Sequence, residues 1–167
     1  MSDKNECSVC RRPKATSVCE ACDEYVCKNC TQILDDTAFS FLEKRPDAVS
    51  HSHYCSSCFD SKVVPELEIY NEIMERAKNV FVFFTTQRKT IPTIRRSKHA
   101  VHVKKCHDRE ETILRLAFFA AQENFNALTD VELTSQKIRN EAYQTSSWQG
   151  SGVPAEVDAD KVERWMS

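Results

Sequence analysis

The first 58 residues hold eight of the nine cysteines of the chain, and all eight belong to Cys-x-x-Cys pairs. The pairs are Cys7/Cys10, Cys19/Cys22, Cys27/Cys30 and Cys55/Cys58. Two intervening residues let both sulfurs of a pair reach one tetrahedral ion from a single tight turn, and thiolates are soft ligands that suit Zn²⁺. The segment therefore has the ligands for two zinc ions per chain, each bound by four cysteines.

Disulfides and iron–sulfur clusters are the other common uses of paired cysteines. Disulfides need an oxidising compartment, and the stretch from Met1 to Cys7 has no apolar run that would serve as a secretory signal. We therefore expect a cytoplasmic protein whose thiols stay reduced. Iron–sulfur clusters also use four cysteines, but the even pairing at treble-clef-like spacing favours zinc.

The order in which the pairs combine determines the fold of this segment. Pairing the second pair with the third would leave the first and fourth to meet across the domain, so the main choices are sequential and interleaved. Sequential zinc ribbons usually place glycine after the second cysteine of a knuckle, where φ is positive. Here those positions hold Arg11, Asp23, Thr31 and Phe59. We therefore favour an interleaved cross-brace, with site 1 formed by Cys7, Cys10, Cys27 and Cys30 and site 2 by Cys19, Cys22, Cys55 and Cys58.

The central run Cys19-Glu-Ala-Cys22-Asp-Glu-Tyr-Val-Cys27-Lys-Asn-Cys30 resembles the FYVE and FYVE-related zinc fingers, and residues 15–30 also resemble B-box fingers. The resemblance covers residues 5–60 and implies a metal-binding finger. FYVE fingers that bind phosphoinositides carry a basic Arg/His-rich motif beside the third ligand, where residues 14–18 here read Lys-Ala-Thr-Ser-Val. The histidine ligand of RING ubiquitin ligases is also missing.

His51 and His53 precede Cys55 and are alternative ligands of the kind that B-boxes use. Because eight cysteines already complete two tetrahedra, we expect these histidines to lie outside the metal shells. The first 60 residues have few large apolar side chains, so their folding should depend on metal. A structural zinc contributes about 10–16 kcal/mol of folding free energy in small fingers.

The pattern of apolar residues predicts two helices after the third cysteine pair. A short helix should begin at Asp35 or Asp36 and end before Arg45 and Pro46. A second helix should run from Val63 to Asn79, because Leu67, Tyr70, Ile73, Met74 and Ala77 recur at three- and four-residue steps. We therefore divide the chain into a finger at 1–60, a connecting helix at 61–79 and a domain of unknown function at 80–167.

The segment 80–167 is expected to be a small ββαββ domain, which makes the whole chain α+β. The predicted strands are Val80–Phe84, Ile91–Val103, Val131–Leu133 and Tyr143–Val157. Asp108 and Glu111 form a capping box for a helix through about Phe125, with Leu114, Phe118, Ala121 and Phe125 as its buried stripe. A terminal helix carrying Val162 and Trp165 should follow Asp158.

Leu116–Val131 and the run Trp148-Gln-Gly-Ser-Gly-Val-Pro154 resemble the small bacterial YbjQ-like α/β domains. In those domains a long Ala-rich helix leads into a strand, and a further strand ends in a Gly-x-Gly-x-Pro run. The resemblance implies the fold, and because many of these domains form oligomers, it also implies a homo-oligomer through the C-terminal domain.

Residues 88–105 contain seven cations and no acid, and they are the candidate site for an anion. Clustered cations neutralise phosphates, so RNA, DNA or an anionic lipid head group would be the ligand. Lysines on a sheet edge also protect it against strand pairing, and no aromatic residue is interleaved for base stacking. The candidate residues are Arg88, Lys89, Arg95, Arg96, Lys98, Lys104 and Lys105.

No enzymatic site is predicted. Cys106 and His107 are adjacent, and on an extended chain their side chains point to opposite faces, so they do not form a nucleophile–base pair. A third metal site would need His102 with Cys106 or His107. Phosphate-binding loops, His-Glu-x-x-His helices and nucleophile elbows do not occur.

Three functional hypotheses follow. The first is a zinc-binding, non-enzymatic adaptor whose metal sites hold a protein-recognition module, and we favour it. The second is nucleic-acid or anionic-ligand binding through residues 88–105. The third, which the missing histidine disfavours, is a RING-like ubiquitin ligase. The formal net charge of −2 gives no strong field toward nucleic acid, and no transmembrane segment is expected.

Overall fold

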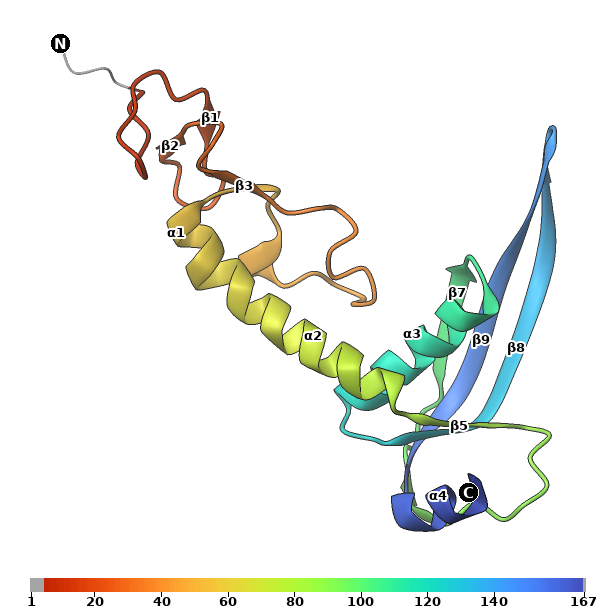
Figure 1. Cartoon of the computed structure of the whole chain (residues 1–167). Helices are drawn as coiled ribbons and strands as arrows, with labels where there is room; N and C mark the ends of the chain where they lie inside the picture. The colour runs from red at the N-terminus through yellow and green to blue at the C-terminus, as the bar shows by residue number, and fades with distance from the viewer. Residues whose placement is uncertain (1–4, 167) are drawn as a thin grey trace. The chain divides into compact units, whose positions relative to one another are not determined.

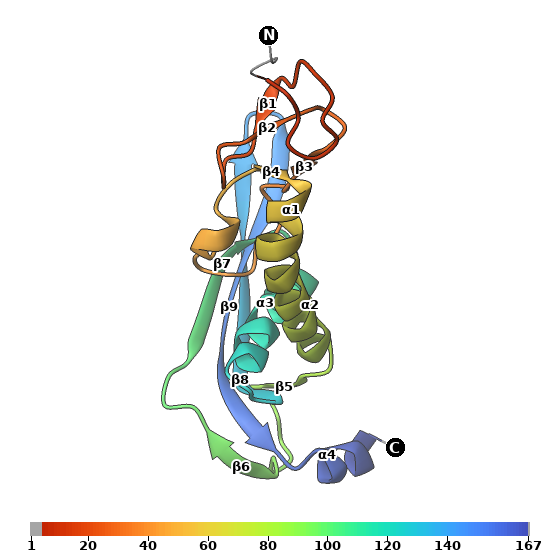
Figure 2. The ribbon, with the colours of Figure 1, turned by 90° about the vertical axis from the view of Figure 1, so that its left-hand side faces the viewer.

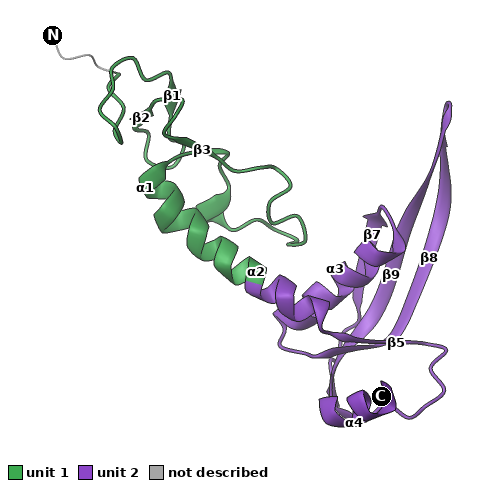
Figure 3. Ribbon diagram, viewed as in Figure 1, with its two compact units in different colours: residues 1–71 green, residues 72–167 purple. Residues whose placement is uncertain are grey.

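The computed structural model describes residues 5–166 (Figure 1). Two compact units make up the chain, residues 1–71 and 72–167 (Figure 3). Helix α2, Val64–Lys78, contributes residues to both. Its bounds lie within one residue of the predicted helix, and Ile73 and Ala77 are buried as the apolar spacing requires.

The N-terminal unit contains two very short antiparallel strand pairs. Strand β1 (Ser17–Val18) pairs with β2 (Tyr25–Val26), and β3 (Thr31–Ile33) pairs with β4 (His53–Cys55). A single α-turn, α1 (Ser56–Cys58), and a π-helical turn, η2 (Phe59–Val63), lead into α2. Isolated strand pairs of this length are not stable in water, so their stability must come from what packs around them.

The core of this unit is built partly from sulfur. Cys7, Cys19, Cys55 and Cys58 are buried together with a small set of apolar side chains. Tyr54 is the largest of these and is fully buried. The other buried members are Ala15, Val26, Leu34, Phe39, Val49 and Val63.

The helix predicted after Asp35 is wrong, because residues 36–41 form turns, and between residues 5 and 52 the only helical element is a 3-10 turn, η1 (Asp47–Val49). Asp35 accepts hydrogen bonds from the Thr37 backbone and hydroxyl, each at 2.9 Å. The Arg45 guanidinium donates to the carbonyls of Asp35 and Ala38, both at 2.9 Å. Phe39 adopts a φ of 62°. Side chains that bond the local backbone compete with helix formation, and in this segment they stabilise turns in its place.

The C-terminal unit is a five-stranded sheet with helices against it. Strand β5 (Phe81–Phe84) pairs in parallel with β8 (Ala127–Asn140), which forms a long antiparallel hairpin with β9 (Tyr143–Val157). Strands β6 (Thr93–Arg96) and β7 (Val101–Cys106) both pair with β9, β6 near its C-terminal end and β7 further back (Figure 2). Helix α3 (Arg109–Gln122) contacts β7, β8 and β9. Helix α4 (Ala159–Met166) ends the described chain.

The order of elements differs from the predicted ββαββ in two ways. The expected strand Ile91–Val103 is two strands, because the chain turns away from the sheet after Ser97, whose hydroxyl accepts from the His99 N–H at 3.2 Å and donates to the His99 carbonyl at 3.1 Å. The expected strand Val131–Leu133 is part of the much longer β8. An irregularity between Thr129 and Glu132 interrupts its pairing, with Asp130 at a φ of 53°.

The capping box of α3 is present, but Glu111 binds the N–H of the residue before the N-cap, and not the N–H of the N-cap residue itself. Asp108 accepts from the Glu111 N–H at 2.7 Å, and the Glu111 carboxylate accepts from the His107 N–H at 2.6 Å. The buried face is rotated from the predicted stripe: Phe118 and Ala121 are buried, whereas Leu114 and Phe125 are only half-buried. The buried residues of α3 are Thr112, Leu116, Ala117, Phe118, Ala120 and Ala121.

Gly150 lets α3 lie close to the sheet. A Cβ at this position would be 2.7 Å from Leu133 Cδ2 and 2.9 Å from Thr112 Cγ2, which is closer than real Cβ atoms approach. Thr112 is fully buried, and its hydroxyl donates to the Asp108 carbonyl at 2.7 Å. The helix therefore cannot give way at this point without losing its first-turn contact.

We expect Gly150→Ala to lower the free energy of unfolding of the C-terminal unit by about 1–3 kcal/mol, the range for overpacking a tight core. Thermal or urea unfolding followed by circular dichroism measures this. Ser151→Ala, the next residue on the opposite face, is the control and should change stability by about 0.5 kcal/mol or less. Equal effects of the two substitutions would show that Gly150 does not set the helix–sheet distance.

Candidate metal centres

Two groups of four cysteines come together in the N-terminal unit. In each group the four sulfur atoms all lie within 4.8 Å of one another. The groups are interleaved along the chain: site 1 combines the first pair with the third, and site 2 combines the second with the fourth. Site 1 contains Cys7, Cys10, Cys27 and Cys30, and site 2 contains Cys19, Cys22, Cys55 and Cys58.

Backbone hydrogen bonds explain this interleaving. The Ser8 N–H donates to the Tyr25 carbonyl at 2.8 Å, which holds the first pair beside the strand that leads to Cys27. The Glu20 N–H donates to the His53 carbonyl at 3.0 Å, which holds the second pair beside the strand that ends at Cys55. Each knuckle is therefore fixed to the strand that supplies the other half of its site.

The glycine argument used to choose between pairing orders is wrong. Arg11 and Asp23, which follow the first two pairs, have φ values of 65° and 63°. Their N–H groups donate to the carbonyls of Cys7 at 3.0 Å and Cys19 at 2.8 Å. The knuckle turns thus form without glycine, and the missing glycines carry no information about which pairs combine.

The donor set fits a tetrahedral metal ion. The Cys10 and Cys27 sulfurs are 3.6 Å apart, and those of Cys22 and Cys55 are 3.9 Å apart. Four sulfurs around zinc at about 2.3 Å would be separated by about 3.8 Å. A disulfide requires about 2.0 Å, and all nine cysteines are free thiols. The spacing is that of a shared metal shell, with no bond between the sulfurs.

Hydrogen bonds and burial shift the pKa values of the thiols within a site in opposite directions. For Cys7, burial opposes ionisation, but the N–H groups of Cys10, Cys27 and Val9 outweigh it and lower the pKa to about 6. In the same site, the pKa of Cys30 is raised to about 12, first by its hydrogen bond with the Cys27 sulfur and then by burial. One thiol ionises readily while another resists, because four negative sulfurs at this spacing repel one another without a cation.

Site 2 also contains one thiol with a lowered pKa and another with a raised pKa. Burial raises the pKa of Cys19, but the N–H groups of Cys55 and Cys22 reverse this and lower it to about 7. The pKa of Cys58 is raised to about 12 by burial and by the Cys55 sulfur. Cys55 also caps α1, since its sulfur accepts from the Cys58 N–H at 3.4 Å.

The two histidines lie outside both sulfur shells and contact the same carboxylate. His51 Nδ1 is 3.7 Å and His53 Nδ1 is 3.5 Å from Glu20 carboxylate oxygens. The Ser52 N–H donates to Glu20 at 2.9 Å and is the main cause of the lowered pKa of that carboxyl. Glu20 had no distinguishing sequence signal apart from its position next to Cys19, and it links the second knuckle to the segment before β4.

The basic segment does not form one open patch. Arg95 pairs with Glu156 at 2.7 Å, and Arg96 pairs with Asp130. The Lys89 ammonium lies 5.8 Å from the centre of the Trp165 ring. Part of the predicted cation cluster is therefore used inside the unit, where it joins β6 to β8 and β9.

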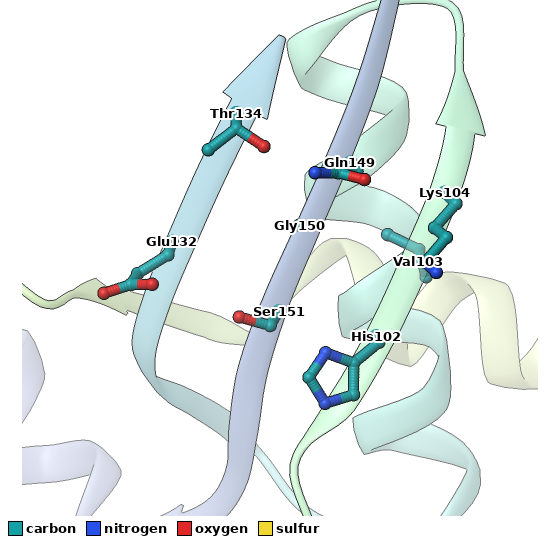
Figure 4. Close-up of a pocket in the computed structure, with 8 residues that line it drawn as sticks. All are labelled: His102, Val103, Lys104, Glu132, Thr134, Gln149, Gly150 and Ser151. Carbon is teal, nitrogen blue, oxygen red and sulfur yellow. The ribbon is translucent and has the colours of Figure 1, made fainter.

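His102 and Lys104 line an open pocket of about 240 Å³ on the sheet face (Figure 4). His102 is opposite Ser151, and Ser151 is opposite Glu132, so these three form a row across β7, β9 and β8. Strand irregularities flank the pocket, one after Val103 with Lys105 at a φ of 58° and the other before Glu132. Glu132, Gln149 and Ser151 were not singled out in the sequence, because only the pairing register brings them beside His102.

Cys106 and His107, which are adjacent in sequence, lie in different environments. Cys106 is buried, with its sulfur 3.7 Å from the Lys104 carbonyl. His107 is exposed, and its N–H is bound by Glu111. Among residues 5–166, the two cysteine clusters are the only groups of three or more Cys, His, Asp or Glu side chains close enough to share an ion.

Comparison with protein-family models, with curated proteins and with solved structures returned no match to this chain. Within the described part of the chain, no helix is both long enough and apolar enough to cross a bilayer.

We expect the purified protein to bind two zinc ions per chain, and Cys10→Ala or Cys22→Ala to remove one each. Cys106→Ala is the matched control, because this cysteine belongs to neither cluster, and it should keep both ions. Elemental analysis of protein dialysed against metal-free buffer measures the stoichiometry. Equal loss in all three variants would contradict the assignment of ligands.

We also expect zinc to be released as pH falls. Cys7 and Cys19 have lowered pKa values, so the stability that their thiolates provide is present at higher pH and is lost as pH falls through about 6–7. Protons compete with the metal in the same direction. A chromogenic chelator followed from about pH 8 to about pH 4 would record this. Metal retention that is independent of pH would show that the ligands are not thiolates.

Proposed function

We propose that this protein is a zinc-dependent, non-enzymatic interaction module. The observation that carries the proposal is the pair of complete four-sulfur clusters. Four protein ligands close a tetrahedral zinc shell and leave no position for water or substrate. The metal would therefore act on the fold and take no part in chemistry, which fits the resemblance of residues 5–60 to FYVE-related and B-box fingers.

An apolar surface beside site 1 supports recognition of a protein partner. Val18 and Tyr25 are directly opposite each other in the β1–β2 pair and are 42% and 40% exposed. Val9, in the first knuckle, is 42% exposed, and its neighbour Ser8 is hydrogen-bonded to Tyr25. Exposed apolar groups that cluster are typical of interaction sites. Zinc would hold this surface in shape by fixing the knuckle against β2.

Binding of nucleic acid through residues 88–105 is the weaker proposal. Two of the seven cations are committed to Glu156 and Asp130, so fewer remain to neutralise phosphates. The RING-like alternative gains no support either, since both sites use cysteine alone.

We expect the double substitution Val18→Lys with Tyr25→Lys to abolish partner capture from the native cell extract while zinc content stays at two per chain. Ile94→Lys is the control, because Ile94 is 64% exposed but lies in the C-terminal unit. Quantitative affinity purification followed by mass spectrometry compares the three proteins. If the double variant keeps the partners of the wild type, the apolar surface is not the recognition site.

A further inference from the structure

Strand β5 is an unprotected edge of the sheet. Among the strands of residues 5–166, β5 stands first in the order of its sheet and pairs with β8 alone. No charged residue occurs in residues 79–86. Proteins usually protect edge strands with charge or proline, and this chain does so elsewhere: β6 follows Pro92 and contains Arg95 and Arg96, and β7 contains two lysines. Strand β5 itself carries no such charge, which is the pattern expected of an edge that a partner covers.

The backbone at this edge is ready to pair. The Phe81 N–H donates to the Asn126 carbonyl at 3.0 Å, and the Thr85 N–H donates to the Val131 carbonyl at 3.2 Å, so odd-numbered residues point toward β8. Successive residues of a strand direct their backbone groups to opposite sides. The N–H and C=O of Val82 therefore point to the open edge.

Apolar grooves lie on both faces of β5. The groove on the α3 side, of about 390 Å³, is lined by Val80, Val82 and the half-buried Ile113 and Leu114. The groove on the α4 side, of about 500 Å³, is lined by apolar side chains that include Phe81, Phe83, Trp165 and Met166, and also by Gln87 and Lys89. Met166 is 77% exposed. A strand added beside β5 would need apolar side chains on both faces to fill these grooves, and β5 itself has that character.

The charges along the groove are self-complementary. Lys78 and Glu110 both line the groove on the α3 side, and both are exposed. Within its own chain Lys78 is paired with Glu75 at 2.9 Å, and this exposed i,i+3 pair is weak enough for Lys78 to exchange it for a carboxylate of a partner. Lys78 precedes β5, whereas Glu110 lies near its other end, where Arg109 is 5.2 Å from the centre of the Phe84 ring. In an antiparallel two-fold pairing, the start of each β5 lies beside the end of the other. Lys78 of each copy then meets Glu110 of its partner.

We propose that two copies of this chain associate through β5, antiparallel and about a two-fold axis, so that their sheets join into one. The interface is isologous, with Val82 near its centre and an ion pair of Lys78 with Glu110 at each end. This inference is independent of the zinc sites and specifies how the C-terminal unit self-associates. A different protein supplying an extended strand is the competing occupant.

Sedimentation equilibrium of the zinc-loaded full chain tests the proposal, and a dimer is expected. Val82→Pro should raise the dimer dissociation constant at least about tenfold. Its own fold should survive, because proline is tolerated where the N–H faces away from the sheet. Ile94→Lys on the protected edge should leave the constant unchanged.

Charge reversal gives a second test that does not touch the strand. Lys78→Glu and Glu110→Lys should each weaken the dimer about three- to tenfold, and the double variant should restore it, as expected for a directly interacting pair. A wild-type monomer at all concentrations, a ring of more than two copies, or a dimer that neither Val82→Pro nor the reversals weaken would overturn the proposal. A monomer that binds an extended apolar peptide through β5 would assign the edge to the competing occupant.

Discussion

Eight thiols held within two clusters are the constraint on which the N-terminal unit depends. Its strand pairs contain two or three residues per strand, and four of the clustered cysteines are themselves part of the buried core. The pKa of Cys30 is raised first by the neighbouring Cys27 sulfur, and that of Cys58 first by burial and then by the Cys55 sulfur, so the assembled clusters disfavour ionisation of all four thiols at once. Binding of a divalent cation would replace repulsion between thiolates by attraction to the metal. Folding of this unit and binding of the metal would then be coupled. A zinc ion bound by four thiolates would have no open coordination position, so in the proposed function the metal acts on the fold alone.

The C-terminal unit is stabilised by different means. Its core is the contact of α3 with the sheet, which Gly150 makes close enough to bury Thr112, Leu116 and Ala120. Cross-strand ion pairs, Arg95 with Glu156 and Arg96 with Asp130, hold the short β6 to its neighbours. Exposed pairs of this kind contribute little stability each. Their larger effect is to give the β6 edge a charge that the β5 edge lacks.

The sequence predicted the grouping of the cysteines better than it predicted helices, buried faces and strand register. Ligand identity followed from spacing, because two sulfurs on one turn have few other uses in a reduced protein. The prediction of a helix after Asp35 was wrong, because the apolar residues Phe39, Phe41 and Leu42 fit a helix as well as they fit the observed turns. Only the structure shows that Arg45 binds the backbone carbonyls of this segment. Leu114 was placed in the core because a helical stripe has no intrinsic phase relative to the sheet, and that phase is set by Gly150, a residue far along the chain. The row of His102, Ser151 and Glu132 depends on strand register, which alternation alone does not define.

The apolar side chains that each unit leaves exposed are the candidate surfaces for binding a partner. In the N-terminal unit Val9, Val18 and Tyr25 are exposed beside site 1, while Ile33 on β3 and Ile69 on α2 are exposed as well. In the C-terminal unit the exposed large apolar side chains are dispersed: Ile94 lies on β6, Ile138 and Tyr143 lie on the β8–β9 hairpin, and Met166 lines the groove beside β5. Burial of these groups would release water from apolar surface, whereas the polar row on the open face of the sheet is already well solvated. Association with a partner is the function that we propose for these surfaces, because four thiolates around a zinc ion would leave no coordination position for a substrate.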